Sequence, residues 1–181
     1  MQLSFLLAYA LAAAFLAVGG CANGPAIAPP DVPPNLRPPS AEVLFLEARG
    51  SGVQIYECAL KPGQPLTYGW IFRGPEAALV DRSGHSLGKH YAGPTWESND
   101  GSSVVGALKA QDSGPRASAI PWLLLTAKTT AGTGVFSATT SIQRLQTVGG
   151  VAPAEACGAA NAAQLARVPY TATYYFYRAA R

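Results

Sequence analysis

The chain has 181 residues, and its 13 Lys and Arg against 10 Asp and Glu give a net charge of +3. Every charged side chain follows residue 20, and the basic ones are scattered singly rather than gathered in a run. Because proteins that bind nucleic acid concentrate Lys and Arg on one surface, this composition argues against nucleic acid as a partner.

The first predicted element is an export signal over residues 1–20. This segment contains no Asp, Glu, Lys or Arg, is rich in Leu, Ala and Phe, and ends in small residues, which is typical of a secretory signal peptide. The usual Lys or Arg near the start is missing, which leaves two alternatives open: a start further upstream, or a weak signal. We therefore expect the protein to be exported.

The residues that close this segment, Val18-Gly-Gly-Cys21, resemble a bacterial lipobox, in which the Cys is lipidated and becomes the new N-terminus. We expect Cys21 to carry the lipid and the membrane to be a partner through it, as in a periplasm-facing or surface outer-membrane lipoprotein. Two alternatives remain: cleavage near Ala22, which gives a soluble secreted protein, and an uncut segment kept as a short membrane anchor.

Residues 21–40 are predicted to form a tether. Seven prolines lie between Pro25 and Pro39. Proline fixes φ and lacks the N–H donor, so this stretch is expected to be a semi-rigid extended spacer of about 3.1 Å per residue. The remaining residues, 41–181, have the size of one ordinary domain.

Short β-rich runs separated by turn signals fill most of residues 41–181. The runs cover residues 42–48, 53–58, 67–72, 77–81, 86–91, 95–97, 103–109, 121–128, 135–145 and 170–177. Gly50-Ser-Gly52 is interpreted as a turn, and Asn99-Asp-Gly101 is a strong hairpin signal. About nine short strands without βαβ alternation predict an all-β fold, an antiparallel β-sandwich or barrel-like single domain.

Three of these segments carry more specific predictions. Residues 121–128 include four consecutive apolar side chains, which suits a strand buried on both faces, although a short helix fits the same pattern. Residues 154–166 contain seven Ala and predict one short Ala-rich helix near the C-terminus. The aromatic run over residues 170–177 is interpreted as a core strand.

The cysteines fit an exported protein. With Cys21 lipidated, Cys58 and Cys157 remain as an even pair in an oxidising compartment, so we expect a disulfide between them. Closing a loop of about 100 residues contributes up to about 4.7 kcal/mol in the chain-entropy model. The alternative is a pair of buried free thiols.

Several blocks of the chain resemble the uncharacterised domain-of-unknown-function 3455 (DUF3455) family. These blocks are Val32-Pro-Pro-Asn-Leu-Arg-Pro38, Gly52-Val-Gln-Ile-Tyr-Glu-Cys58, His90-Tyr-Ala-Gly-Pro-Thr-Trp-Glu97, Ser141-Ile-Gln-Arg-Leu-Gln-Thr-Val-Gly-Gly150 and Val168-Pro-Tyr-Thr-Ala-Thr-Tyr-Tyr-Phe-Tyr177. The resemblance covers roughly residues 32–178. It implies a secreted bacterial or fungal domain and carries over no activity, cofactor or catalytic residue.

The densest group of functional side-chain types lies in residues 88–97. His90, Tyr91, Trp96 and Glu97 are candidates to line a cleft in which aromatic rings stack against a small molecule or glycan and polar groups orient it. The competing interpretation, which the large buried area of aromatic residues favours, is a turn between two strands with Trp96 in the core. If His90 and Trp96 are fully buried with all their polar atoms paired, both site hypotheses fall.

No metal or cofactor is expected. The two histidines, His85 and His90, are five residues apart, so an alternating strand directs them to opposite faces, and no dense His/Cys cluster exists. No G-x-S-x-G motif is present. We therefore expect a non-catalytic binding or envelope-associated module. The alternative is a small secreted enzyme acting on a carbohydrate or envelope component, with His90 and Glu97 converging in an open pocket as an acid–base pair.

Overall fold

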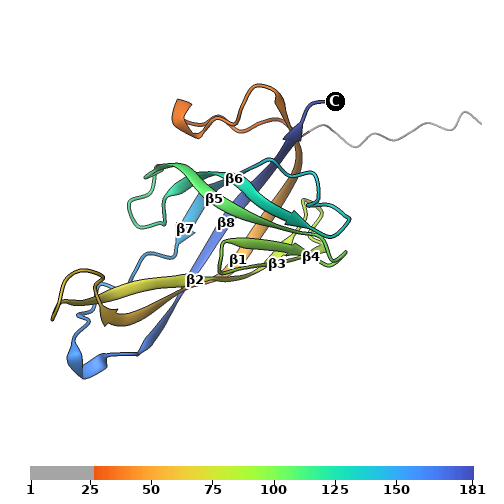
Figure 1. Cartoon of the computed structure of the whole chain (residues 1–181). Coiled ribbons are helices and arrows are strands. Elements are labelled where there is room, and N and C mark those ends of the chain that lie inside the picture. Colours follow the sequence, from red (N-terminus) through yellow and green to blue (C-terminus); the bar gives the residue numbers. More distant parts are fainter. Residues whose placement is uncertain (1–26) are drawn as a thin grey trace, which may run out of the picture.

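A ring of eight antiparallel strands forms the protein (Figure 1). This computed structural model describes residues 27–181, so the predicted signal peptide over residues 1–20 and the lipidation of Cys21 lie outside the described residues. The strands are β1 (Glu42–Leu60), β2 (Tyr68–Val80), β3 (Ser86–Tyr91), β4 (Thr95–Ser98), β5 (Ser103–Asp112), β6 (Trp122–Ala131), β7 (Ser141–Gly149) and β8 (Leu165–Ala179). Two short 3-10 turns, η1 (Pro34–Leu36) and η2 (Ala159–Asn161), complete the described elements.

Each strand pairs with the next along the chain, and β1 also pairs with β8 over most of its length, which closes the barrel. The all-β prediction is confirmed, and of its two alternatives the structure is the barrel. Within residues 27–181, no helix has the length and apolar character that a membrane span requires.

The turn predicted at Gly50-Ser-Gly52 is wrong, because β1 runs straight through these residues and joins two predicted strands into one. The reason is space inside the barrel. A Cβ atom at Gly50 would lie 2.7 Å from Cε2 of Tyr174, and one at Gly52 would collide with the backbone of β2. These glycines let neighbouring groups approach β1 closely; they do not reverse the chain.

The aromatic strand β8 is buried on both faces, so the prediction of a core strand is confirmed. Tyr170, Tyr174 and Phe176 belong to the core cluster inside the barrel, together with Trp96, Leu125 and Ile142. The alternate side chains of the run, Tyr175 and Tyr177, belong to a second cluster on the outer face. Period-2 alternation therefore distributes one aromatic run between two cores.

The outer face of β6, β7 and β8 is covered by the segment that contains η1. Val32 and Leu36 are buried against Leu124, Leu145 and the outer tyrosines of β8. A hydrogen bond from Nε2 of Gln143 to the carbonyl of Leu36, 2.7 Å long, fixes the segment. Because this segment covers the outer face, adjacent residues of β6 are both buried: Leu124 packs beneath the segment and Leu125 packs inside the barrel. A strand buried on both faces is what the four-residue apolar run predicted. The chain thus packs on the barrel from Val32 onward.

The helix predicted over residues 154–166 is wrong: the segment contains only η2, and β8 begins at Leu165. Its backbone is engaged by β1 instead. The predicted Cys58–Cys157 disulfide is present, the N–H of Ala163 donates to the carbonyl of Cys58, and the N–H of Cys58 donates to the carbonyl of Gln164. Fixed to a strand by these bonds, the Ala-rich segment cannot form the i to i−4 bonds of a helix, whatever its propensity.

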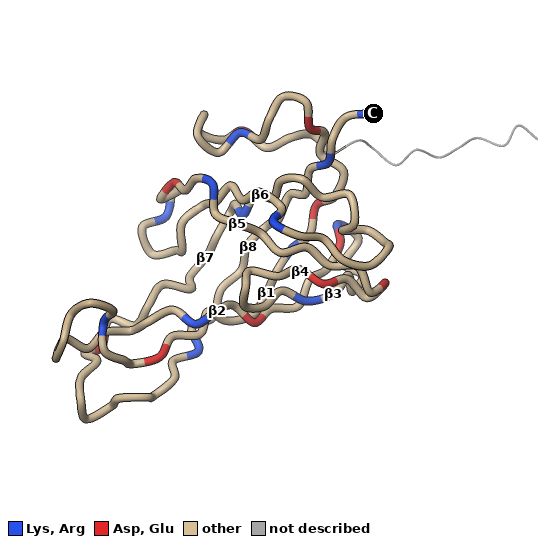
Figure 2. The backbone as a smooth tube through the Cα atoms, in the orientation of Figure 1, with Lys and Arg blue, Asp and Glu red and all other residues tan. Residues whose placement is uncertain are grey.

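The end of β1, the start of β2 and the segment before β8 extend together beyond the ring as an arm, seen at the lower left of Figure 1. Besides the disulfide, a hydrogen bond of 2.9 Å from Nε1 of Trp70 to the carbonyl of Glu155 holds this arm together. Figure 2 shows basic and acidic residues interspersed along the chain, as the scattered charges of the sequence indicate.

Candidate functional site

The four candidate residues of the β3–β4 hairpin lie on two different faces of the barrel. In the hairpin register His90 is opposite Trp96, and Lys89 is opposite Glu97. His90 and Trp96 point into the barrel, where they are 2% and 1% exposed. Tyr91 and Glu97, each one residue further along, point outward and are half-buried. The structure therefore does not assemble the single cleft that the sequence suggested.

The outer pair forms a surface cluster with Lys89. The hydroxyl of Tyr91 donates to Oε2 of Glu97 at 2.7 Å, and Nζ of Lys89 lies 3.1 Å from Oε1. The Tyr91 hydrogen bond, followed by that of Lys89, lowers the pKa of Glu97, while the same bond raises the pKa of Tyr91. Glu97 is thus held as a carboxylate on the outer face, away from the imidazole of His90, and the two do not converge.

The inner pair forms a rigid aromatic stack. The rings of His90 and Trp96 lie 4.3 Å apart and 14° from parallel, and Tyr174 packs its edge against both. Burial, the dominant effect, lowers the pKa of His90 to about 3, so its imidazole is neutral at physiological pH. Nδ1 lies 2.8 Å from the carbonyl of Thr95. Because a carbonyl only accepts, Nδ1 carries the proton, and Nε2 is left as an acceptor.

These buried side chains are not fully paired. Nε1 of Trp96 has no hydrogen-bond partner among the described residues, and Nε2 of His90 makes no hydrogen bond within them. His90 and Trp96 are therefore fully buried, but their polar atoms are not all paired. The two site hypotheses were to fall only if both conditions were met, so they stand. Native proteins rarely leave a buried polar atom unpaired, so the free indole N–H of Trp96 draws attention to the space beside it.

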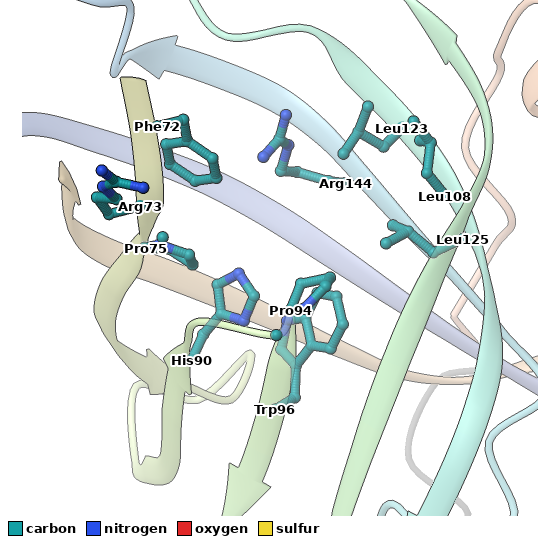
Figure 3. Close-up of a pocket in the computed structure, with 12 residues that line it drawn as sticks. Phe72, Arg73, Pro75, His90, Pro94, Trp96, Leu108, Leu123, Leu125 and Arg144 are labelled. Atoms are coloured by element: carbon teal, nitrogen blue, oxygen red, sulfur yellow. The ribbon is translucent and has the colours of Figure 1, made fainter. Parts of the chain in front are cut away.

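A cavity of about 200 Å³ opens beside the His90–Trp96 stack, at the mouth of the barrel (Figure 3). Apolar side chains from β2, β5, β6 and the β3–β4 turn form its walls: Phe72, Pro75, Pro94, Leu108, Leu123 and Leu125. Phe72 and Leu108 are 49% and 60% exposed, which places them at the rim. The cavity thus connects the interior of the barrel with solvent.

Arg144 of β7 brings a positive charge into this cavity, and its guanidinium lies between Phe72 and Leu123 in Figure 3. Nε and Nη2 both donate to the carbonyl of Pro121, at 3.2 and 2.9 Å. None of the ion pairs among residues 27–181 includes Arg144. Burial lowers the pKa of Arg144, yet a guanidinium keeps its proton in proteins.

The sequence reasoning missed Arg144, although the sequence contained a signal for it. In Ser141-Ile-Gln-Arg-Leu145, Ile142 and Arg144 share one face of a strand, and Ile142 is completely buried inside the barrel. A charged residue in register with a core residue is unusual and identifies a candidate functional position. Leu108 and Leu123 carried no such signal, because their place in the lining of the cavity depends on how the barrel closes.

The described part of the chain offers no metal centre: between residues 27 and 181, no three His, Cys, Asp or Glu side chains lie close enough together to hold an ion. Within its apolar walls the cavity presents a cation, Arg144, a neutral imidazole acceptor, His90, and an indole donor, Trp96.

Comparison with known proteins gives a family and no mechanism. The family described as "Protein of unknown function (DUF3455)" matches residues 39–178, which is nearly all of the barrel. No curated protein and no solved structure matches the chain. The match agrees with the resemblance noted from the sequence blocks, and the chain belongs to the DUF3455 family.

Proposed function

We propose that this protein is an exported, non-catalytic binding module that holds a small ligand in the cavity at the mouth of its barrel. The observation that carries the proposal is the cavity itself. Sites for small molecules are concave and mostly apolar, with a few polar groups that orient the ligand. The mouth cavity has this composition, with Arg144, His90 and Trp96 as the polar groups.

Binding is favoured over catalysis by the placement of the titratable side chains. An acid–base mechanism with His90 and Glu97 needs both groups at one substrate, but Glu97 lies on the outer face in its cluster with Tyr91. The His90 imidazole, with its pKa lowered to about 3, is a weak base. It is better suited to accepting a hydrogen bond than to taking up a proton.

We also propose that the barrel is attached to the cell envelope through a lipid on Cys21. Support comes from the apolar segment that ends in Val18-Gly-Gly-Cys21 and from the Cys58–Cys157 disulfide, a bond that persists mainly outside the cytoplasm. Intact mass spectrometry of the protein from the membrane fraction tests this. We expect a chain that begins at Cys21 with acyl groups attached; an unlipidated soluble product would remove the anchor.

The binding proposal is tested by closing the cavity. A library of small acids, alcohols and monosaccharides is screened against the purified protein by ligand-observed NMR. Leu123→Trp places a large side chain at the wall of the cavity, whereas Leu165→Trp, at a 62% exposed position on the arm, is the matched control. We expect hits to bind the wild type and the control and to lose binding to Leu123→Trp. Hits that bind all three proteins equally would refute the proposed site.

A further inference from the structure

The geometry points to a hydroxy-substituted aromatic carboxylate as the ligand of the mouth cavity, with its carboxylate on Arg144 and its hydroxyl donating to Nε2 of His90. This inference rests on the proposed function and adds the chemical class of the ligand. Three independent features carry it: the charge of Arg144, the size of the cavity and the rings in its walls, and the free acceptor on His90.

The first feature is the uncompensated charge. Two arginines line the cavity, and they differ in their partners. Nε of Arg73 lies 2.9 Å from Oε2 of Glu57, so the charge of Arg73 is neutralised within the protein. Among residues 27–181, Arg144 donates hydrogen bonds only to the carbonyl of Pro121, from Nε and Nη2, so Nη1 has no hydrogen-bond partner there.

A cation enclosed by apolar walls carries an unrecovered desolvation cost unless an anion joins it. The planar fork of a guanidinium matches a carboxylate, which it can bind through two parallel N–H···O bonds. The remaining donors of Arg144 therefore favour a carboxylate ligand over a neutral one.

The second feature is the size and shape of the cavity. Its volume is about 200 Å³. A buried apolar cavity of about 150 Å³ admits benzene, so the mouth cavity has room for one ring with small substituents and is too small for a glycan chain. The rings of Phe72, Pro75 and Pro94 line the cavity beside the His90–Trp96 stack (Figure 3). Walls that contain rings favour an aromatic ring, which packs against such side chains, over a branched aliphatic body.

The third feature is the acceptor on His90. Its Nδ1–H is committed to the carbonyl of Thr95, and the stack on Trp96 fixes the plane of the ring. In Figure 3 the other ring nitrogen, Nε2, is directed toward the side of the cavity where Arg144 lies. A ligand held by its carboxylate on Arg144 is therefore close to an acceptor that a ring hydroxyl can satisfy.

The test compares a matched series of probes by calorimetry on the purified protein: benzoate, 3-hydroxybenzoate, 4-hydroxybenzoate and benzamide, the uncharged isostere of benzoate. We expect at least one hydroxybenzoate to bind more tightly than benzoate, and benzoate to bind about tenfold or more tightly than benzamide. Equal binding of benzoate and benzamide would overturn the carboxylate assignment without the use of any variant.

Variants then locate the two contacts. Arg144→Gln is expected to lose about tenfold or more in affinity for every carboxylate of the series, with Arg144→Lys between the two because it keeps the charge without the fork. His90→Gln is expected to reduce the preference for the hydroxyl group. Arg116→Gln, an exposed loop position, is the matched control. Near-UV circular dichroism of each variant checks that the barrel has folded.

The outcomes separate this inference from the proposed function. If neutral fragments bind the cavity, are lost in Leu123→Trp and are unaffected by Arg144→Gln, the carboxylate class is refuted and the binding module stands. If the benzoates bind with unchanged affinity to Arg144→Gln, the assignment of the carboxylate to Arg144 is refuted. If no probe of any class binds the wild type, the proposed function itself is refuted.

Discussion

The burial of His90 as a neutral imidazole predicts that the protein loses stability as the pH falls through the range in which an ordinary histidine titrates. The pKa of His90 is about 3 in the folded protein, against 6.5 for an unperturbed histidine. Between these values the unfolded chain binds a proton that the folded chain does not, so stability rises with pH and is lost on acidification.

The magnitude follows from the two pKa values. At 1.36 kcal/mol per pKa unit, lowering the pH from 7.5 to 4.5 should cost about 2–3 kcal/mol of unfolding free energy through His90 alone. The range ends at pH 4.5 so that the titration of Asp100 does not overlap with that of His90. Hydrogen bonds from Ser102 and Val135 lower the pKa of Asp100 to about 2, against about 4 for a carboxyl of the unfolded chain, so Asp100 stabilises the fold fully above about pH 4. That contribution is lost mainly at lower pH.

Urea unfolding followed by circular dichroism at half-unit steps from pH 7.5 to 4.5 measures this dependence. In His90→Gln we expect a lower stability and a much flatter pH dependence. His85→Gln is the matched control, because His85, with a side chain 81% exposed, is the other histidine of the chain. An unchanged slope in His90→Gln would show that the buried neutral imidazole is not the source of the pH dependence and would refute the reasoning.

Three further experiments test the construction of the barrel. Leu36→Ala removes a completely buried side chain from the covering segment and should cost about 2–4 kcal/mol by urea unfolding, whereas a loss below about 1 kcal/mol would mean that the segment is not bound to the barrel. Replacing both Cys58 and Cys157 by Ala should cost about 2–4 kcal/mol and make the unfolding midpoint insensitive to reductant; a midpoint equal to that of the oxidised wild type would contradict the role of the disulfide. Gly52→Ala should lower the free energy of unfolding by more than about 2 kcal/mol, because the new Cβ collides with the backbone of β2. Gly158→Ala, whose Cβ faces open space, should change it by less than about 0.5 kcal/mol. Thermal melting curves that rank the two variants the other way would refute the packing argument.

The sequence predicted the strands well where their signal was local. The hairpin at Asn99-Asp-Gly101 joins β4 to β5, and the apolar run 121–128 became β6, because turn chemistry and β-branched or apolar runs act over a few residues. Gly50-Ser-Gly52 has the composition of a turn, but the stretch is extended because it pairs with β2 on one side and β8 on the other, and its glycines let both strands approach closely. The Ala-rich segment failed as a helix for a similar reason, since a partner strand engaged its backbone.

The candidate site was half visible in the sequence. His90 and Trp96 do line the cavity, as the sequence suggested for their block. Tyr91 and Glu97 do not, because side chains alternate along a strand and these two point to the opposite face. Applied strictly, the period of 2 already directs His90 and Tyr91 to opposite faces. Arg144 could be suspected from its register with Ile142, but its partners could not, because they come from strands distant in sequence.

Local patterns by themselves determined that this chain is an all-β domain with a Cys58–Cys157 disulfide, since strand periodicity, turn residues and cysteine number are properties of short segments and of composition. Only the tertiary structure decided that the strands close into a barrel, that the N-terminal segment covers its outer face, and that Arg144 meets the His90–Trp96 stack at one cavity. The physical reason is that sandwiches and barrels share the same period-2 pattern. The pairing of β1 with β8 makes this domain a barrel, and it joins strands from the two ends of the domain, so no local pattern can reveal it.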